Sequence, residues 1–178
     1  MITKMIGTSN TQDSTIELPR RLYLDTQFCF AYLVDSDPDH QAAADFSIVL
    51  KQLSSANLVT CYFSILTLDE LAWKLGALVF ERDRGQGAWR KADKARAFAA
   101  VRNEVADTIR DFIQEPWISV LRVHDRAYTL ACSWMRTHNL KPADLCHMVL
   151  ASTVGAAIVS NDGDFRRIRS APVEVITY

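Results

Sequence analysis

Five acidic side chains stand where a protein could use them for chemistry: Asp25, Glu70, Asp144, Asp162 and Asp164. Asp25 ends the apolar segment RLYLD and Asp162 lies just past AAIVS, while Glu70 and Asp144 lie near the beginnings of helical segments. Clustered carboxylates raise one another's pKa unless a cation neutralises them. Hard oxygen ligands select Mg²⁺ or Mn²⁺ rather than zinc. Such a cluster predicts metal-dependent hydrolysis of a phosphate ester.

Each acid also has a purely structural interpretation. Asp25 or Thr26 could cap the helix that follows them. Thr67-x-x-Glu70 matches a capping box, which would use the Glu70 carboxylate for the backbone alone. Taken singly, neither Asp25 nor Glu70 therefore identifies a site.

The acids near the end of the chain have similar alternatives. Asp144 follows Pro142 by two residues and could be a first-turn acid that the helix dipole favours. Asn161–Gly163 is a typical turn, with Asp164 as a candidate helix cap. Four independent caps need not fall at one edge of one sheet, however, so the set as a whole favours a metal site. His147, one turn beyond Asp144 in an apolar run, is interpreted as a packed histidine rather than a ligand.

The elements that must position these acids alternate along the chain. Strands are expected over 21–25, 57–63, 117–123, 156–160 and 173–178. Helices are expected over 26–36, 39–56, 64–80, 88–114, 124–139 and 143–155, with a short one after the 161–163 turn. This order predicts one α/β domain over 21–178, with a mainly parallel, twisted sheet of about four to five strands and helices on both faces. Residues 1–20 are expected to form a polar, flexible arm.

The charge and composition of the chain do not exclude RNA as a partner. The net charge of −1 gives no global basic field, but local patches can still contact RNA. Trp89 could stack on an unpaired base or pack inward. The basic side chains expected to bind RNA are Arg82 and Arg84 in the long helical stretch, and Arg166 and Arg167 beside the last acids.

The four cysteines are scattered through apolar stretches, at positions 29, 61, 132 and 146. They are expected to be buried, reduced thiols of a cytoplasmic protein, because neither a disulfide framework nor a zinc motif fits their spacing. No apolar run reaches the length of about 20 residues that a membrane span needs. The expected location is therefore the cytoplasm, with no membrane partner.

Three segments together resemble PIN-domain nucleases: YLDTQ, SILTLDEL and PADLCHMVLASTVGAAIVSNDGDFRRI. The resemblance runs from Arg21 to Tyr178. It implies a metal-dependent endoribonuclease that uses Mg²⁺ or Mn²⁺ to hydrolyse RNA. VapC-like toxins are a subgroup of this family, and that subgroup implies a protein antitoxin and a homodimer. The helical stretch 81–114 is longer than these compact toxins usually carry.

The resemblance also assigns roles to residues. It matches Asp25, Glu70, Asp144 and Asp162 to the four family acids, and Asp164 to an additional one. The metal ligands it implies are Asp25, Asp144 and Asp162, with small hydroxyls nearby at Thr26 and Ser160. Two alternatives remain open: a catalytically silent PIN-like domain that binds RNA or protein, and a Mg²⁺-dependent phosphatase. A phosphatase of the common D-x-D kind would need a second acid where this chain has Gln27.

Overall fold

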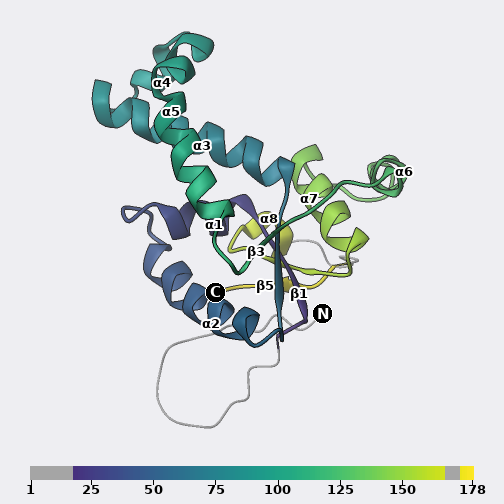
Figure 1. Ribbon diagram of the computed structural model, residues 1–178. Helices are drawn as coiled ribbons and strands as arrows, with labels where there is room; N and C mark the ends of the chain where they lie inside the picture. Colours follow the sequence, from purple (N-terminus) through teal and green to yellow (C-terminus); the bar gives the residue numbers. More distant parts are fainter. Residues whose placement is uncertain (1–17, 167–172) are drawn as a thin grey trace.

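Five parallel strands form one sheet in the order β3-β2-β1-β4-β5 (Figure 1). Their neighbours pair in register, so that Tyr23 of β1 lies between Tyr62 of β2 and Ile158 of β4. This confirms the predicted parallel sheet. The strands are β1 (Arg21–Leu24), β2 (Thr60–Phe63), β3 (Ile118–Val120), β4 (Ala157–Val159) and β5 (Val175–Ile176).

The computed structural model describes residues 18–166 and 173–178. Most of the predicted arm, and Arg167 with it, lies outside these residues. The helices within them are α1 (Thr26–Leu33), α2 (His40–Ser55), α3 (Ile65–Arg84), α4 (Ala88–Lys91), α5 (Lys94–Ile113), α6 (Asp125–Trp134), α7 (Pro142–Thr153) and α8 (Gly163–Arg166).

Side chains of the central strands alternate between two cores. Leu22 and Leu24 of β1 pack with α1, α2, α3 and α5 on one face, whereas Tyr23 packs with α6 and α7 on the other. β4 alternates in the same way, with Val159 in the first core and Ile158 in the second. Since successive strand residues point to opposite faces, this alternation confirms the prediction of helices on both faces of the sheet.

The predicted long helix over 88–114 is wrong in one respect, because the chain breaks near its beginning. α4 ends at Lys91, and Asp93 then caps α5 by accepting a hydrogen bond from the Arg96 backbone at 2.9 Å. Gly85 and Gly87, both at positive φ, turn the chain between α3 and α4. α3 and α5 pack along each other and project away from the sheet, with α4 at the tip of this projection (Figure 1).

The thiols differ from the expectation in their exposure. Cys29 and Cys61 are buried, and burial raises the pKa of the Cys61 thiol to about 12. Cys132 is exposed on α6, because the inward face of that helix is carried by residues such as Ala127 instead. Among the described residues no helix is long and apolar enough to cross a membrane.

Candidate metal centre

The candidate site lies where the strand order reverses. β2 and β3 follow on one side of β1, whereas β4 and β5 lie on its other side. In parallel sheets ligands bind at the carboxyl ends of the strands beside such a switch point. Asp25 directly follows β1 and Ser160 directly follows β4, and the Asp25 backbone N–H donates to the Val159 carbonyl at 3.3 Å. This edge therefore carries the first acid and a hydroxyl beside it.

The Asp25 carboxylate is buried and faces other side chains. It stands at the N-cap position of α1 but makes no side-chain capping bond there, so the capping interpretation is wrong. Instead, the Ser160 hydroxyl donates to Asp25 Oδ2 at 2.7 Å, and His147 Nε2 lies 3.6 Å from Asp25 Oδ1. The side chain is 7% exposed. The fold thus buries a carboxylate at this edge without using it for the helix.

Glu70 projects from α3 toward the same point. α3 begins at Ile65 with Ser64 as its cap, so the predicted capping box with Thr67 is not formed. Two donors bind Glu70 Oε2: the Thr26 hydroxyl at 2.6 Å and His147 Nε2 at 3.0 Å. The hydrogen bond from His147 is the largest cause that lowers the Glu70 pKa, while partial burial opposes it. Glu70 is therefore held ionised at neutral pH.

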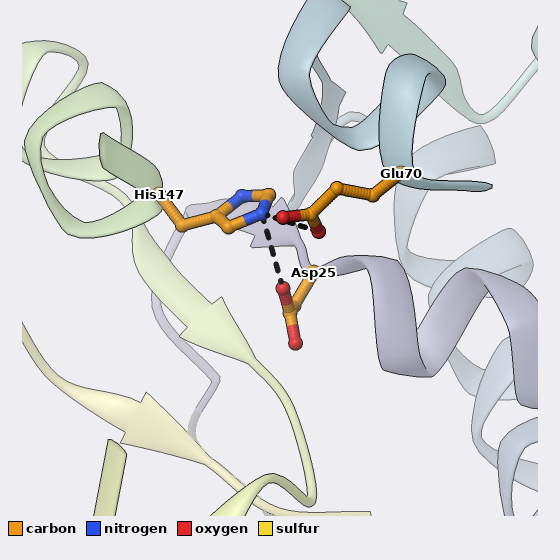
Figure 2. Close-up of side chains that lie close together, drawn as sticks. All are labelled: Asp25, Glu70 and His147. Atoms are coloured by element: carbon orange, nitrogen blue, oxygen red, sulfur yellow. Dashed lines mark hydrogen bonds and ion pairs between the residues drawn. The ribbon is translucent and has the colours of Figure 1, made fainter. Parts of the chain in front are cut away.

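His147 is the residue whose role sequence reasoning underestimated. It is a packed histidine, as predicted, and 1% exposed, but it packs against the acids (Figure 2). A nitrogen of its ring and one carboxylate oxygen each of Asp25 and Glu70 all lie within 4.8 Å of one another. Its place one turn after Asp144, on the side of α7 that faces the sheet, was the only signal in the sequence.

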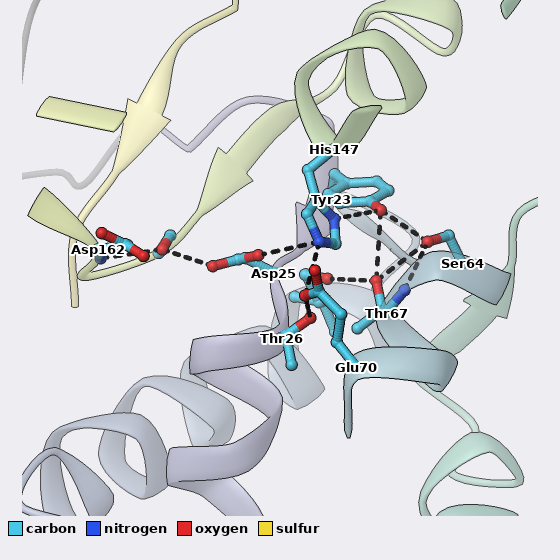
Figure 3. Close-up of polar contacts among 10 residues, drawn as sticks. Tyr23, Asp25, Thr26, Ser64, Thr67, Glu70, His147 and Asp162 are labelled. Atoms are coloured by element: carbon cyan, nitrogen blue, oxygen red, sulfur yellow. Dashed lines mark hydrogen bonds and ion pairs between the residues drawn. The ribbon is translucent and has the colours of Figure 1, made fainter. Parts of the chain in front are cut away.

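A second set of buried hydroxyls, which no sequence pattern indicated, lies behind His147. Tyr23 Oη is 2.8 Å from His147 Nδ1, 2.6 Å from Ser64 Oγ and 3.3 Å from Thr67 Oγ1 (Figure 3). Thr67 in turn donates to the Leu24 carbonyl at 3.3 Å. Burial raises the pKa of Tyr23, so its hydroxyl stays protonated. These contacts connect β1 and α7 to the beginning of α3.

Asp144 is the acid whose surroundings most clearly call for a cation. Burial raises its pKa, and the charges of Asp162, Asp164 and Asp25 raise it further, whereas Lys141 lowers it. Its Oδ2 atom is buried without a hydrogen-bond partner among the described residues. A buried oxygen without a partner is costly unless an ion or water binds it. First-turn placement in α7 does not satisfy this atom.

The last two acids surround the beginning of α8. Asp162 Oδ1 accepts a hydrogen bond from the Asp164 backbone at 2.8 Å, so Asp162 rather than Asp164 caps this short helix. Asp164 instead pairs with Lys141, at 2.5 Å between Nζ and Oδ2. Ser160 joins this region to Asp25, because its Oγ also accepts from the Asp162 backbone at 3.0 Å. Asp162 and Asp164 thus lie next to the other acids. Each also stabilises the local fold, Asp162 by capping α8 and Asp164 by its ion pair with Lys141.

The residues present fit a divalent cation. Their donors are carboxylate oxygens, the ligands that Mg²⁺ and Mn²⁺ prefer. One of these oxygens is buried and has no hydrogen-bond partner within residues 18–166 and 173–178. Three acids acting on the pKa of a fourth show that negative charge is concentrated here. Lys141, which lies beside these acids, forms an ion pair with Asp164.

Two basic residues predicted to bind RNA lie far from the acids. Arg82 follows Glu70 by twelve residues on α3, about 18 Å at ~1.5 Å per residue. Its guanidinium forms a two-pronged pair with Glu104, and Arg84 lies over the Phe80 ring. Trp89 is buried against Trp73 and Phe80, so it packs inward and is not a platform for a base. The position of the Arg166 side chain is outside what the structure describes.

We expect Asp144→Asn to stabilise the metal-free protein, because it removes a partly buried charge among like charges. The unfolding midpoint in EDTA at pH 7 should rise by roughly 1–3 °C. The folded-state pKa is raised above the ordinary 3.8, so Asp144 lowers stability as pH rises through that window. The gain should therefore shrink as pH falls toward 3.8, and thermal unfolding at several pH values measures it. Asp125→Asn, which removes an exposed first-turn acid of α6, is the control; an equal rise there would contradict the prediction.

Together the fold and the site define a class: a parallel α/β domain whose carboxylates gather at a switch point of its sheet. The family follows from comparison with known proteins. The model of the PIN domain matches residues 22–171, and the chain belongs to the PIN-domain family. The family resemblance in the sequence is thereby confirmed. A comparison with curated protein sequences finds no match.

Solved structures of similar fold include toxin–antitoxin proteins. VapBC2 from Rickettsia felis, bound to a promoter DNA fragment, is 15% identical with a TM-score of 0.57, and the match covers 88% of this chain and 98% of that one. VapC20 from Mycobacterium tuberculosis, a toxin that cleaves the sarcin-ricin loop, is 19% identical with a TM-score of 0.52, covering 86% and 98%. DNA-bound VapBC from Salmonella typhimurium is 14% identical with a TM-score of 0.54, covering 88% and 97%. At these identities the likeness shows the shared fold.

Proposed function

We propose that this protein is a metal-dependent endoribonuclease that hydrolyses phosphodiester bonds of RNA. The observation that carries the proposal is the buried Oδ2 of Asp144, which has no hydrogen-bond partner in the described part of the chain and lies among other carboxylates. Membership of the PIN-domain family supports the reaction class. The similar fold of VapC20, a toxin that cleaves the sarcin-ricin loop, supports RNA as the substrate.

In this proposal Asp25, Asp144 and Asp162 hold Mg²⁺ or Mn²⁺, with Glu70 and Asp164 binding directly or through water. A bound divalent ion supplies a water of lowered pKa and positive charge beside the leaving 3′-oxygen. Ser160 fixes the Asp25 carboxylate by donating to Oδ2, and Thr26 fixes Glu70 by donating to Oε2. These supporting hydroxyls keep both carboxylates in place when the substrate phosphate arrives.

RNA also needs positive charge on the protein. We assign Arg166 and Arg167, which follow Asp164 in sequence, to the neighbourhood of the cut bond. Arg82 and Arg84, at the far end of α3, would contact RNA only away from it.

We further propose that the protein acts in the cytoplasm as the toxin of a toxin–antitoxin pair. The similar structures of the VapBC complexes support a protein antitoxin as partner. The homodimer is what the resemblance to VapC-like toxins implies. Expression of the chain without any partner should then slow the growth of its host, and Asp25→Asn should restore growth. Normal growth with soluble, active wild type would contradict the toxin role.

Cleavage of labelled single-stranded RNA tests the nuclease proposal. Wild type with Mg²⁺ or Mn²⁺ should give shorter fragments with 5′-phosphate and 3′-hydroxyl ends, and EDTA should stop the reaction until excess metal is added. Binding of RNA without cutting under any divalent metal would favour the catalytically silent alternative. Release of inorganic phosphate from a phosphomonoester, with intact RNA chains, would favour the phosphatase.

A further inference from the structure

We infer that His147 is a positioning residue of the metal centre: it holds Glu70 in place, and the buried Tyr23 hydroxyl holds His147. The inference rests on the proposed function, since it concerns the metal site of that reaction. Neither Tyr23 nor His147 belongs to the set of acids that the family resemblance assigns. Their role follows from which atoms of the imidazole ring meet which partners (Figure 3).

The first step concerns the Nε2 atom of His147. It lies 3.0 Å from Glu70 Oε2 and 3.6 Å from Asp25 Oδ1. Ionised carboxylates only accept hydrogen bonds, so Nε2 carries a hydrogen and donates. A ring nitrogen that carries a hydrogen offers no lone pair to a metal. His147 therefore binds the carboxylates rather than the ion.

The second step concerns Glu70, which has three rotatable side-chain bonds and sits on the second turn of α3. The hydrogen bonds from His147 and Thr26 both end on Oε2, so Oε1 carries neither of them. Two donors on one oxygen fix the plane of the carboxylate and leave its other oxygen for the metal or a metal-bound water. The lowered pKa of Glu70 agrees with this arrangement.

The third step concerns what holds the ring itself. Tyr23 is fully buried and its Oη lies 2.8 Å from His147 Nδ1. Ser64, the cap of α3, lies 2.6 Å from the same hydroxyl and also accepts from the Thr67 backbone at 3.1 Å. The orientation of the ring is thus tied to the first turn of α3, the helix that carries Glu70. Removing a direct hydrogen-bond partner of a metal ligand, as His147 is of Glu70, typically changes metal affinity 10- to 100-fold.

Binding of Mn²⁺, followed by the EPR signal of the free ion, tests the inference without an activity assay. His147→Leu should weaken Mn²⁺ binding by roughly tenfold, and Tyr23→Phe by about threefold. His147→Gln retains an N–H donor and should recover most of the affinity. Tyr62→Phe, on the neighbouring strand, is the matched control and should bind Mn²⁺ as wild type does. Thermal unfolding in EDTA identifies any variant that does not fold; His147→Gln and Tyr23→Phe then carry the test.

Coupling between the residues separates positioning from a merely structural role. Tyr23→Phe should cost no further Mn²⁺ affinity in a His147→Leu background, and His147→Leu should cost none in a Glu70→Gln background. Wild-type Mn²⁺ affinity in both Tyr23→Phe and His147→Leu would overturn the inference. So would a nitrogen coupling in the pulsed EPR spectrum of bound Mn²⁺ that His147→Leu removes, because His147 would then be a ligand.

The failure of the inference differs from the failure of the proposed function. If Asp25→Asn abolishes Mn²⁺ binding while the His147 and Tyr23 variants bind normally, the metal centre stands and only the positioning role falls. If wild type binds no Mn²⁺ that Asp25→Asn can remove, the proposed metal centre and the positioning role fall together.

Discussion

Replacing Asp25 with asparagine is expected to lower the rate of RNA cleavage by roughly 10³-fold, a loss of about 4 kcal/mol of transition-state stabilisation. Asp25 is the acid that most other parts of the site contact: it accepts from Ser160, faces His147, and its charge reaches Asp144. The amide has nearly the same shape but no negative charge, so the fold should survive while metal binding is lost. Single-turnover cleavage of labelled RNA at saturating Mn²⁺ measures the effect.

The matched control is Asp69→Asn, which removes an exposed acid next to Glu70 on α3. It should change the rate less than twofold, because Asp69 lies on the solvent side of the helix. The thermal midpoint of Asp25→Asn in EDTA should remain within a few degrees of wild type. A cleavage rate for Asp25→Asn within tenfold of wild type would show that the reaction does not depend on this cluster.

Replacing Phe28 with alanine is expected to destabilise the protein by about 3–5 kcal/mol, as large core deletions do. Phe28 is fully buried on α1, and its ring meets those of Phe46, Tyr178 and Tyr32 at centroid distances of 6.1, 5.0 and 6.5 Å. The alanine leaves a cavity between α1, α2 and the end of the chain that rigid aromatic neighbours cannot fill. Urea unfolding followed by tryptophan fluorescence gives the difference in free energy of unfolding.

Ile48→Ala is the control for this prediction, since Ile48 lies on α2 with 55% of its surface exposed. It should cost less than 1 kcal/mol. Phe28→Leu, which fills more of the space, should fall between the two. A loss below about 1 kcal/mol for Phe28→Ala would mean that the aromatic cluster does not anchor α1, the helix that begins with Thr26.

Much of the fold could be predicted because its signals are local. Strand segments such as 21–25 are rich in β-formers and alternate with amphipathic helices, and that order alone favours a parallel sheet. The break between α4 and α5 was missed because the apolar stripe from Phe98 to Phe112 runs on from the preceding residues without a proline. The Asp93 cap is a short polar signal, and such signals are easily outweighed by periodicity.

Among the candidate site residues, the acids were found from their places after strands and at helix beginnings. Asp25 and Asp144 do not fill the structural roles considered for them: the Asp25 side chain does not cap its helix, and Asp144 keeps a buried oxygen without a partner among the described residues. The helix cap expected of Asp164 is made by Asp162 instead, and Asp164 pairs with Lys141. Nothing in the sequence separates these possibilities, because a cap and a ligand use the same residue types.

The sequence by itself determined that this protein is a parallel α/β domain with acids at one edge of its sheet, because the periodicity of apolar residues and the ends of strands are local properties. Only the tertiary structure decided which other residues meet those acids. Tyr23, Glu70 and His147 come from β1, α3 and α7, and their contacts depend on how three elements pack. In the sequence, His147 lies in an apolar run and is therefore predicted to be a core residue. In the folded protein its imidazole donates a hydrogen bond that orients the Glu70 carboxylate.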